Sequence, residues 1–326
     1  MRYTKIGKMD INASVMALGT FAMGGDSNWG PCDDEESTRV IHKAMDLGIN
    51  MFDSAPVYGL GHSEEMLGKA ISGRRDKVFI STKCGLRWDI DEGYIHRQRD
   101  GITLRRSLMP ESIREEVERS LKRLNTDYID LYIPHWQTMA GYEPSKAVTM
   151  EALCLLKKEG KIRGIGLSNV SAEDIQENSK YGQIDLVHNR FSMLERDAQK
   201  DVIEICKEKG IAFQAHSPFQ QGILAGKITL DTIIEIGSRA GNKWYEKENL
   251  KKVLVMLEKF KPLCDKYSCS LSGLVLAWTL QQIPNMIVLC GSRKIAQIEE
   301  NASALDILLE ESDLAMIDRT INETIN

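Results

Sequence analysis

The sequence lacks the features that would place it in a membrane or on nucleic acid. Its longest strongly apolar stretch, Leu271–Leu280, is about half as long as a membrane span requires. The first residues contain no apolar core of a secretory signal, so the expected location is the cytoplasm. Lysine and arginine (42) do not outnumber aspartate and glutamate (47), which argues against a positive field that attracts nucleic acid or anionic lipid.

Patterns typical of disulfides, metals and classical dinucleotide folds are also missing. The seven cysteines include no Cys-x-x-Cys pair, which favours reduced, mostly buried thiols over disulfides or zinc. The Gly-x-Gly pairs at 59–61 and 164–166 lack the third glycine of a Rossmann fingerprint. The acidic run 33–36 is typical of a helix start and has no ligand spacing, so no metal site is expected.

What remains is an ordinary globular composition, with 42% hydrophobic and 27% charged residues in 326. Short apolar runs alternate with segments of helical period. The predicted strands are 15–18, 50–52, 78–81, 128–133, 164–167, 186–189, 212–215 and 286–289. The predicted helices are 35–47, 63–71, 110–124, 144–159, 172–180, 198–209, 248–267 with 271–281, and 295–304. This α/β pattern predicts one domain, residues 1–326, folded as a closed (β/α)8 TIM barrel, with an open doubly wound sheet as the alternative.

Three further segments fall outside the repeating units. Residues 3–5 and 12–14 are predicted to form a β-hairpin over the N-terminal face of the barrel. Residues 84–109 and 217–249 are too long for ordinary connections and are predicted to extend over the C-terminal face as lids.

Four polar side chains follow the ends of adjacent predicted strands: Asp53, Tyr58, Lys83 and His135. Because barrel active sites lie at this face, we expect the four to converge. Lys83 is expected to lower the pKa of the Tyr58 phenol, with Asp53 as the counter-charge of Lys83. His135 is expected to donate a hydrogen bond to a substrate oxygen. The set suits protonation of a carbonyl oxygen while hydride reaches the carbon, and the reverse for alcohol oxidation.

Longer segments resemble the aldo-keto reductase superfamily, which comprises NADP-dependent (β/α)8 barrels. Residues 48–64 resemble its first signature and 120–136 its second. Blocks at 159–169, 217–224 and 291–301 follow in the family's order. The resemblance runs from about Tyr3 to Asp318, and it places the family's catalytic tetrad on the same four residues, with Tyr58 as general acid and base.

The resemblance implies NADP(H) as the cofactor. By this likeness Ser168 and Asn169 would bind the nicotinamide carboxamide, and Arg293 would pair with the 2′-phosphate because its fork matches phosphate oxygens. The implied cofactor-binding residues are Ser168, Asn169, His188, His216, Ser217, Gly222, Leu224, Gly291, Ser292, Arg293, Gln297, Glu300 and Asn301.

Two histidines depart from the family pattern at the reactive end of the cofactor. His188 stands where the family usually has glutamine, and His216 where an aromatic ring, usually tyrosine, stacks on the nicotinamide. Because a protonated imidazole repels the oxidised ring, we hypothesise that oxidised-cofactor binding weakens as the pH falls through the pKa of His216. The alternative is neutral drift at a tolerant stacking position.

Candidate substrate-binding residues are Trp29, Trp88 and Trp136. The insert 84–109 is rich in groups that bind hydroxylated or anionic substrates, although its basic residues are equally compatible with a solvated loop. The leading hypothesis is an NADP(H)-dependent oxidoreductase that interconverts an alcohol and a carbonyl of an aldehyde, ketone or keto-sugar. The alternatives are a cofactor-retaining sugar epimerase or isomerase and a redox-sensing protein resembling potassium-channel β-subunits. The expected partner is a small carbonyl compound or sugar, and the oligomeric state is left open.

Overall fold

A computed structural model describes residues 1–26, 28–139, 141–232, 237 and 239–325. Eight parallel strands close into a barrel, with β13 hydrogen-bonded to β3. They are β3 (Met16–Gly19), β4 (Met51–Asp53), β5 (Phe79–Cys84), β9 (Ile129–Pro134), β10 (Ile162–Ser168), β11 (Leu186–Arg190), β12 (Ala212–His216) and β13 (Met286–Gly291). Each overlaps a predicted strand, so the TIM barrel is confirmed and the open sheet is excluded.

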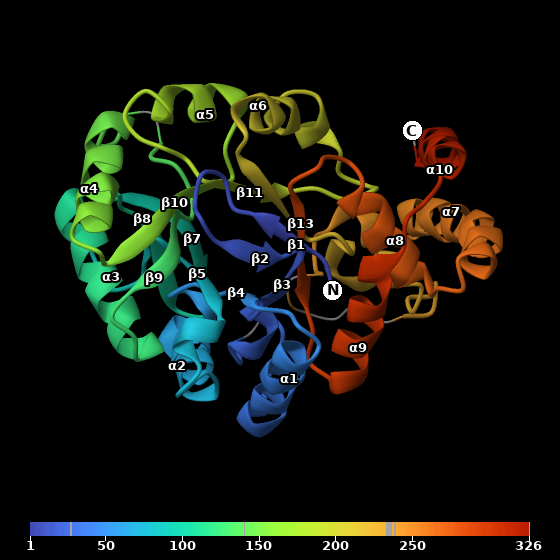
Figure 1. The fold of residues 1–326 in the computed structure, drawn as a ribbon, viewed down its shortest axis with the longest axis horizontal. Helices are drawn as coiled ribbons and strands as arrows, with labels where there is room; N and C mark the ends of the chain where they lie inside the picture. Colours follow the sequence, from blue (N-terminus) through green and yellow to red (C-terminus); the bar gives the residue numbers. More distant parts are fainter. Residues whose placement is uncertain (27, 140, 233–236, 238, 326) are drawn as a thin grey trace.

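Helices surround the strands (Figure 1). They are α1 (Asp34–Asp46), α2 (His62–Ala70), α3 (Pro110–Leu124), α4 (Lys146–Lys158), α5 (Ala172–Asn178), α6 (Val202–Lys209), α7 (Lys247–Lys266), α8 (Leu271–Leu280), α9 (Ile295–Ser303) and α10 (Glu311–Ile325). Short 3-10 turns are η1 (Phe21–Met23), η2 (Tyr58–Gly61), η3 (Arg75–Lys77), η4 (Asp197–Gln199), η5 (Gln220–Ala225), η6 (Lys243–Tyr245) and η7 (Ala304–Asp306). Asp33 accepts backbone hydrogen bonds from Glu35 and Glu36 at 3.0 and 3.1 Å, so the acidic run caps α1 as predicted.

The predicted hairpin is confirmed as β1 (Tyr3–Lys5) paired antiparallel with β2 (Asn12–Ser14). It lies across one end of the barrel (Figure 1). Ile6 is fully buried, and it joins the cluster of apolar side chains inside the barrel that includes Phe79 and Leu131. The hairpin therefore closes this end of the barrel with apolar contacts.

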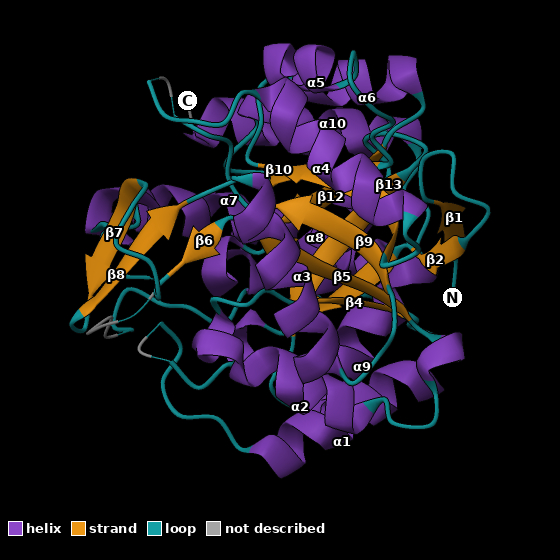
Figure 2. Cartoon of the chain, turned by 90° about the vertical axis from the view of Figure 1, so that its left-hand side faces the viewer, coloured by secondary structure: helices purple, strands orange, loops and turns teal. Residues whose placement is uncertain are grey.

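The first predicted lid is an antiparallel ribbon of β6 (Leu86–Arg87), β8 (Ile102–Arg106) and β7 (Tyr94–Arg99), in that order. Figure 2 shows the ribbon and the N-terminal hairpin at opposite ends of the barrel. Arg87 is buried at the base of the ribbon and pairs with Asp89 and with Glu115 of α3, each at 2.8 Å. The carboxylate of Glu116 accepts the backbone N–H of Gly85 at 3.0 Å. These contacts fix the ribbon to the barrel wall.

The C-terminal helix α10 is not predicted by the sequence pattern. It packs on α7, with Ile317 and Ile321 buried, and Asp318 accepts a hydrogen bond from the indole of Trp278 at 3.1 Å. All seven cysteines are free thiols. Within the described ranges, no helix combines the length and apolar character needed to cross a bilayer.

Candidate active site

Lys83 and Asp53 form a buried ion pair where β5 and β4 end. The ammonium nitrogen of Lys83 lies 2.6 Å from Oδ1 of Asp53 and 2.7 Å from the carbonyl oxygen of Ser54. The Ser81 hydroxyl donates to Oδ2 of Asp53 at 2.8 Å. Burial favours the neutral amine, but Asp53 and the neighbouring Tyr58 outweigh it, so the pKa of Lys83 is raised. Lys83 therefore stays charged at the barrel mouth.

Tyr58 lies against this ion pair at the start of η2. Its ring centroid is 5.0 Å from the Lys83 nitrogen and 4.7 Å from the ring of Phe21. The next residue, Gly59, has φ of +62°, and a Cβ there would lie 2.0 Å from the carbonyl oxygen of Gly24. Only glycine fits this turn without strain. The turn thus fixes Tyr58 against Lys83.

Burial outweighs Lys83 at Tyr58: the ammonium lowers the pKa of the phenol, as expected, but the net pKa lies above its ordinary value. Burial raises the pKa of the phenol, and the ammonium of Lys83 offsets only part of that increase. Desolvation of a phenolate outweighs the field of one neighbouring cation here. Tyr58 is therefore protonated at neutral pH, which is the state required of a proton donor.

His135 follows β9 and completes the group of four. Its ring centroid is 6.0 Å from that of Tyr58, and its carbonyl oxygen accepts a hydrogen bond from the Asn169 side chain at 2.9 Å. Burial and then the charge of Lys83 hold the pKa of His135 well below its usual value. The imidazole is therefore neutral and keeps one N–H to donate. The structure brings together all four residues predicted to converge.

Polar groups of β10, β11 and β12 adjoin this group. The Ser168 hydroxyl lies 3.2 Å from Nδ1 of His188 and 3.1 Å from the Asn169 amide nitrogen. The rings of His188 and His216 are 4.8 Å apart, and Nδ1 of His216 lies 3.2 Å from the Ser217 hydroxyl. Nε2 of His188 is buried without a hydrogen-bond partner among the described residues. Because buried polar atoms are usually hydrogen-bonded, this nitrogen is suited to bind a polar group of a ligand.

Both histidines are neutral at working pH. Burial lowers the pKa of His216 to about 3, with Arg190 and Lys83 adding to the effect. Burial and the neighbouring His216 hold the pKa of His188 well below its usual value. An imidazole with a lowered pKa carries no charge at any pH above that pKa. His216 would therefore gain its proton, and repel the oxidised nicotinamide ring, only near pH 3.

We accordingly expect the Kd of the oxidised cofactor to stay constant between about pH 8 and pH 5. Titration of tryptophan fluorescence measures it directly. His216→Phe, which keeps an aromatic ring but cannot titrate, is the matched control. A wild-type Kd that rises as the pH falls, while that of the control stays flat, would show that His216 gains a proton in this range.

The loop after β12 carries Gly222 and Leu224, two of the residues implied to bind the cofactor. Gly222 has φ of +104°, and a Cβ there would lie 3.2 Å from Nη2 of Arg239. Arg239 donates to the carbonyl oxygen of Gln221 at 3.0 Å, and its guanidinium lies 6.0 Å from the ring of Trp29. The Leu224 side chain is fully buried in the core, so only its backbone can line a cofactor site.

Six of the implied cofactor-binding residues lie where β13 meets α9: Gly291, Ser292, Arg293, Gln297, Glu300 and Asn301. The Gln297 side chain accepts the backbone N–H of Arg293 at 2.8 Å. The Asn301 side chain donates to the Ser292 hydroxyl at 3.3 Å. These contacts order the start of α9, where backbone N–H groups favour phosphate.

The guanidinium of Arg293 is hydrogen-bonded within the protein, whereas the family resemblance suggests that it binds a phosphate. Its Nη1 donates to the carbonyl oxygen of Trp29 at 2.8 Å, and its Nη2 donates to the carbonyl oxygen of Pro31. Glu300 is also engaged, in an ion pair of 2.9 Å with Lys227. Arg293 and Glu300 therefore tie α9 to two different loops of the barrel mouth.

The three tryptophans predicted to bind substrate are placed differently. Trp29 packs edge-on against Phe21 at 6.0 Å, and Phe21 contacts Tyr58. Trp136 follows β9 and contacts the ribbon strand β7. Trp88 lies partly exposed after β6, and within the described part of the chain no ring contact joins it to the other two. Trp29 and Trp136 are thus the two near the polar group of four.

The aldo/keto reductase family model matches residues 15–322. The chain belongs to the aldo/keto reductase family. It is 40% identical over 319 residues to a protein of Escherichia coli (strain K12) named NADH-specific methylglyoxal reductase, covering 97% of each chain. It is 34% identical to aldo-keto reductase YhdN of Bacillus subtilis (strain 168), covering 100% of this chain and 95% of that protein.

Its fold is similar to that of the glycerol dehydrogenase AKR11B4 from Gluconobacter oxydans. The TM-score is 0.90 at 31% identity, over 99% of this chain and 96% of the other. Because these matches cover nearly the whole of each chain, the similarity includes the inserted segments as well as the barrel. The chain is thus an oxidoreductase of the aldo/keto reductase family.

Sequence reasoning missed several residues that shape the mouth of this aldo/keto reductase. Ser81 lies within a strand, and Phe21 and Arg239 lie in segments without a motif, so none carries a local signal. Arg106 is at the end of β8, in an insert whose strands are not predicted. The alternation of apolar and polar residues over 102–105 is the signal that could have indicated a strand there.

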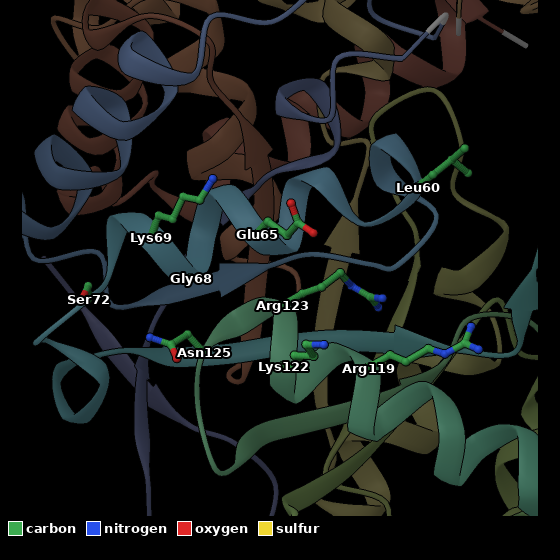
Figure 3. A pocket seen from close by; sticks show the side chains of 9 residues that line it. All are labelled: Leu60, Glu65, Gly68, Lys69, Ser72, Arg119, Lys122, Arg123 and Asn125. Carbon is green, nitrogen blue, oxygen red and sulfur yellow. The ribbon is translucent and has the colours of Figure 1, made fainter.

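A separate groove of about 770 Å³ lies outside the aldo/keto reductase barrel, between α2 and α3 (Figure 3). Its lining includes the basic side chains of Lys69, Arg119, Lys122 and Arg123. Arg123 is already paired with the buried carboxylate of Glu64 at 2.6 Å, and Arg119 is also paired with carboxylates. None of the predicted site residues lines this groove.

Proposed function

We propose that this aldo/keto reductase reduces a small aldehyde, ketone or keto-sugar to the alcohol with a nicotinamide cofactor, and that Tyr58 is the proton donor. The observation that carries the proposal is the Tyr58 phenol held against the buried Asp53–Lys83 pair, beside the neutral His135. The names of the similar proteins, a methylglyoxal reductase and a glycerol dehydrogenase, support a small carbonyl or polyol-derived substrate.

A reduced nicotinamide bound at this mouth supplies the hydride. The Tyr58 hydroxyl transfers its proton to the carbonyl oxygen as negative charge develops there. Lys83 stabilises the resulting phenolate, and Asp53 keeps Lys83 charged. The N–H of His135 donates a hydrogen bond to the same oxygen and orients the carbonyl. Alcohol oxidation uses the same groups in reverse.

The residues around this group fit a nicotinamide cofactor. Ser168 and Asn169 offer side-chain hydrogen-bonding groups, and Nε2 of His188 is buried without a protein partner. The backbone of Gly222 leaves space where any side chain would approach Arg239. We propose that these residues hold the nicotinamide and pyrophosphate parts. A single domain over 1–326 and a cytoplasmic location remain predictions from the sequence.

For the adenosine 2′-phosphate, the proposal is NADP(H) on the family resemblance, and NADH is the alternative that two observations favour. Both Nη atoms of Arg293 already donate to carbonyl oxygens of the β3–α1 loop. The similar E. coli protein is named NADH-specific. Binding of a 2′-phosphate would require Arg293 to exchange these carbonyls for phosphate oxygens.

Arg293→Ala separates these two cofactors. If Arg293 binds the 2′-phosphate, we expect the KM for NADPH to rise about 10- to 150-fold while that for NADH changes little, because a charged hydrogen bond is worth about 1.5–3 kcal/mol. Steady-state kinetics with both cofactors measures this. A wild-type preference for NADH, with equal effects of the variant on both cofactors, would assign Arg293 to loop anchoring instead.

The test of the function itself is nicotinamide oxidation, followed by absorbance, by the purified protein with a panel of aldehydes, ketones and keto-sugars. Turnover that disappears in Tyr58→Phe supports the reductase. Tight cofactor binding with no net redox change on any substrate would support a cofactor-retaining isomerase or a sensor instead.

A further inference from the structure

Arg106 is a half-buried cation next to the candidate catalytic residues. It ends β8, and its guanidinium lies 4.6 Å from the ring centroid of Trp136, the residue after His135. Neighbouring arginines at the base of the ribbon, such as Arg87 and Arg119, form ion pairs with carboxylates. Arg106 forms none with any carboxylate in the described part of the chain. Burial lowers the pKa of Arg106, which shows that its charge is only partly solvated.

The guanidinium is held in one orientation by its contacts. Its Nε donates to Nδ1 of His96 at 3.1 Å, and its Nη1 donates to the carbonyl oxygen of Gln137 at 3.1 Å and lies 3.2 Å from Sδ of Met139. Nη2 donates to no protein atom among the described residues. One edge of the guanidinium is thus fixed by the protein, while the N–H groups of Nη2 remain for a ligand.

His96 accepts the hydrogen bond from Arg106 as a neutral ring. Burial and the charge of Arg106 lower the pKa of His96 to about 4, so its ring is neutral. Because Nδ1 accepts the hydrogen bond from Arg106, the proton of the neutral ring is assigned to Nε2. Burial and Lys83 are the main causes of the lowered pKa of His135, and the charge of Arg106 adds to them, so the guanidinium lies within electrostatic range of His135.

We propose that Arg106 binds a carboxylate of the substrate, and that the preferred substrates are small aldehydes or ketones carrying a carboxylate a few bonds from the reacting carbonyl. The proposal deepens the carbonyl reduction proposed above and rests on it. A carboxylate supplies the counter-charge that the half-buried guanidinium lacks, and its planar geometry matches an N–H donor of arginine. His135 then receives the carbonyl oxygen while Arg106 holds the other end of the molecule.

The test compares two aldehydes, butanal and 4-oxobutanoate. They differ only in that a carboxylate replaces the terminal methyl group of butanal. We expect the wild-type enzyme to have the higher kcat/KM for 4-oxobutanoate. Arg106→Met, which keeps length without charge, should lower kcat/KM for 4-oxobutanoate about 10- to 150-fold, mainly through KM, and change that for butanal less than about twofold. Arg105→Met is the matched control, because Arg105 precedes it in β8 and donates instead to the carbonyl oxygen of Gly93. It should leave both substrates unaffected.

Three results overturn the proposal: a wild-type preference for butanal, equal losses on both aldehydes in Arg106→Met, or the same substrate-dependent loss in Arg105→Met. Equal losses would mean that Arg106 only supports Trp136 and His96. Fluorescence titration with butanoate, which has the carboxylate but no carbonyl, tests binding without turnover. If butanoate binds the wild type and not Arg106→Met while no carbonyl is reduced, the carboxylate site stands and the proposed reductase function fails.

Discussion

Tyr58→Phe is expected to lower kcat for carbonyl reduction by about 10²- to 10⁴-fold, the usual contribution of a positioned general acid. The substitution removes one oxygen and leaves the ring in contact with Phe21 and His135. Because burial keeps the phenol of Tyr58 protonated, the wild-type side chain holds a proton ready for the carbonyl oxygen. The KM for the carbonyl substrate should change little, since the ring still fills its place. Steady-state kinetics at saturating cofactor measures both constants.

Tyr132→Phe is the matched control, because Tyr132 is fully buried in the β9 wall and takes no part in the proposed reaction. It should leave kcat unchanged within about threefold. If Tyr58→Phe keeps more than about a tenth of the wild-type kcat, another group delivers the proton and the proposed role of Tyr58 is wrong.

Lys83→Met is expected to lower the free energy of unfolding by about 3–5 kcal/mol, because it leaves the Asp53 carboxylate buried without its counter-charge. The side chains of Lys83 and Asp53 are 0% and 1% exposed, so water cannot replace the lost partner. Only the Ser81 hydroxyl remains to donate to Asp53 among the described side chains. Urea unfolding at neutral pH measures the change.

The double variant Lys83→Met with Asp53→Leu tests the reason for this loss. Removing both charges of a buried pair is often close to neutral, so most of the stability should return. A double variant as unstable as Lys83→Met would show that packing around Lys83, rather than an unpaired charge, causes the destabilisation.

The barrel and the four converging side chains could be predicted because their signals are local. Each strand is a short apolar run, and Asp53, Lys83 and His135 lie at or just after strand ends, which a parallel barrel gathers at one face. The ribbon strands β7 and β8 escaped prediction because each contains two arginines and neither has a continuous apolar face. Helix α10 escaped because no strand follows it to complete a repeating unit.

Other properties of the site depend on residues that are distant in the sequence. The carbonyl groups that engage Arg293 belong to Trp29 and Pro31, more than 260 positions away. The raised pKa of Tyr58 depends on how deeply the fold buries its phenol, and this depth has no sequence signature. Composition and spacing can indicate which groups gather, whereas the protonation state of each follows from the finished packing.

The β1–β2 hairpin closes the end of the barrel that lies opposite the ribbon. Apolar side chains around Ile6 fill this end, so reactants are expected to approach Tyr58 from the end of the barrel that carries the ribbon. Substitutions in the ribbon or in the loop after β12 are therefore expected to affect the binding and release of substrate and cofactor alike. Substitutions in the hairpin are expected to change the stability of the barrel rather than access to the site.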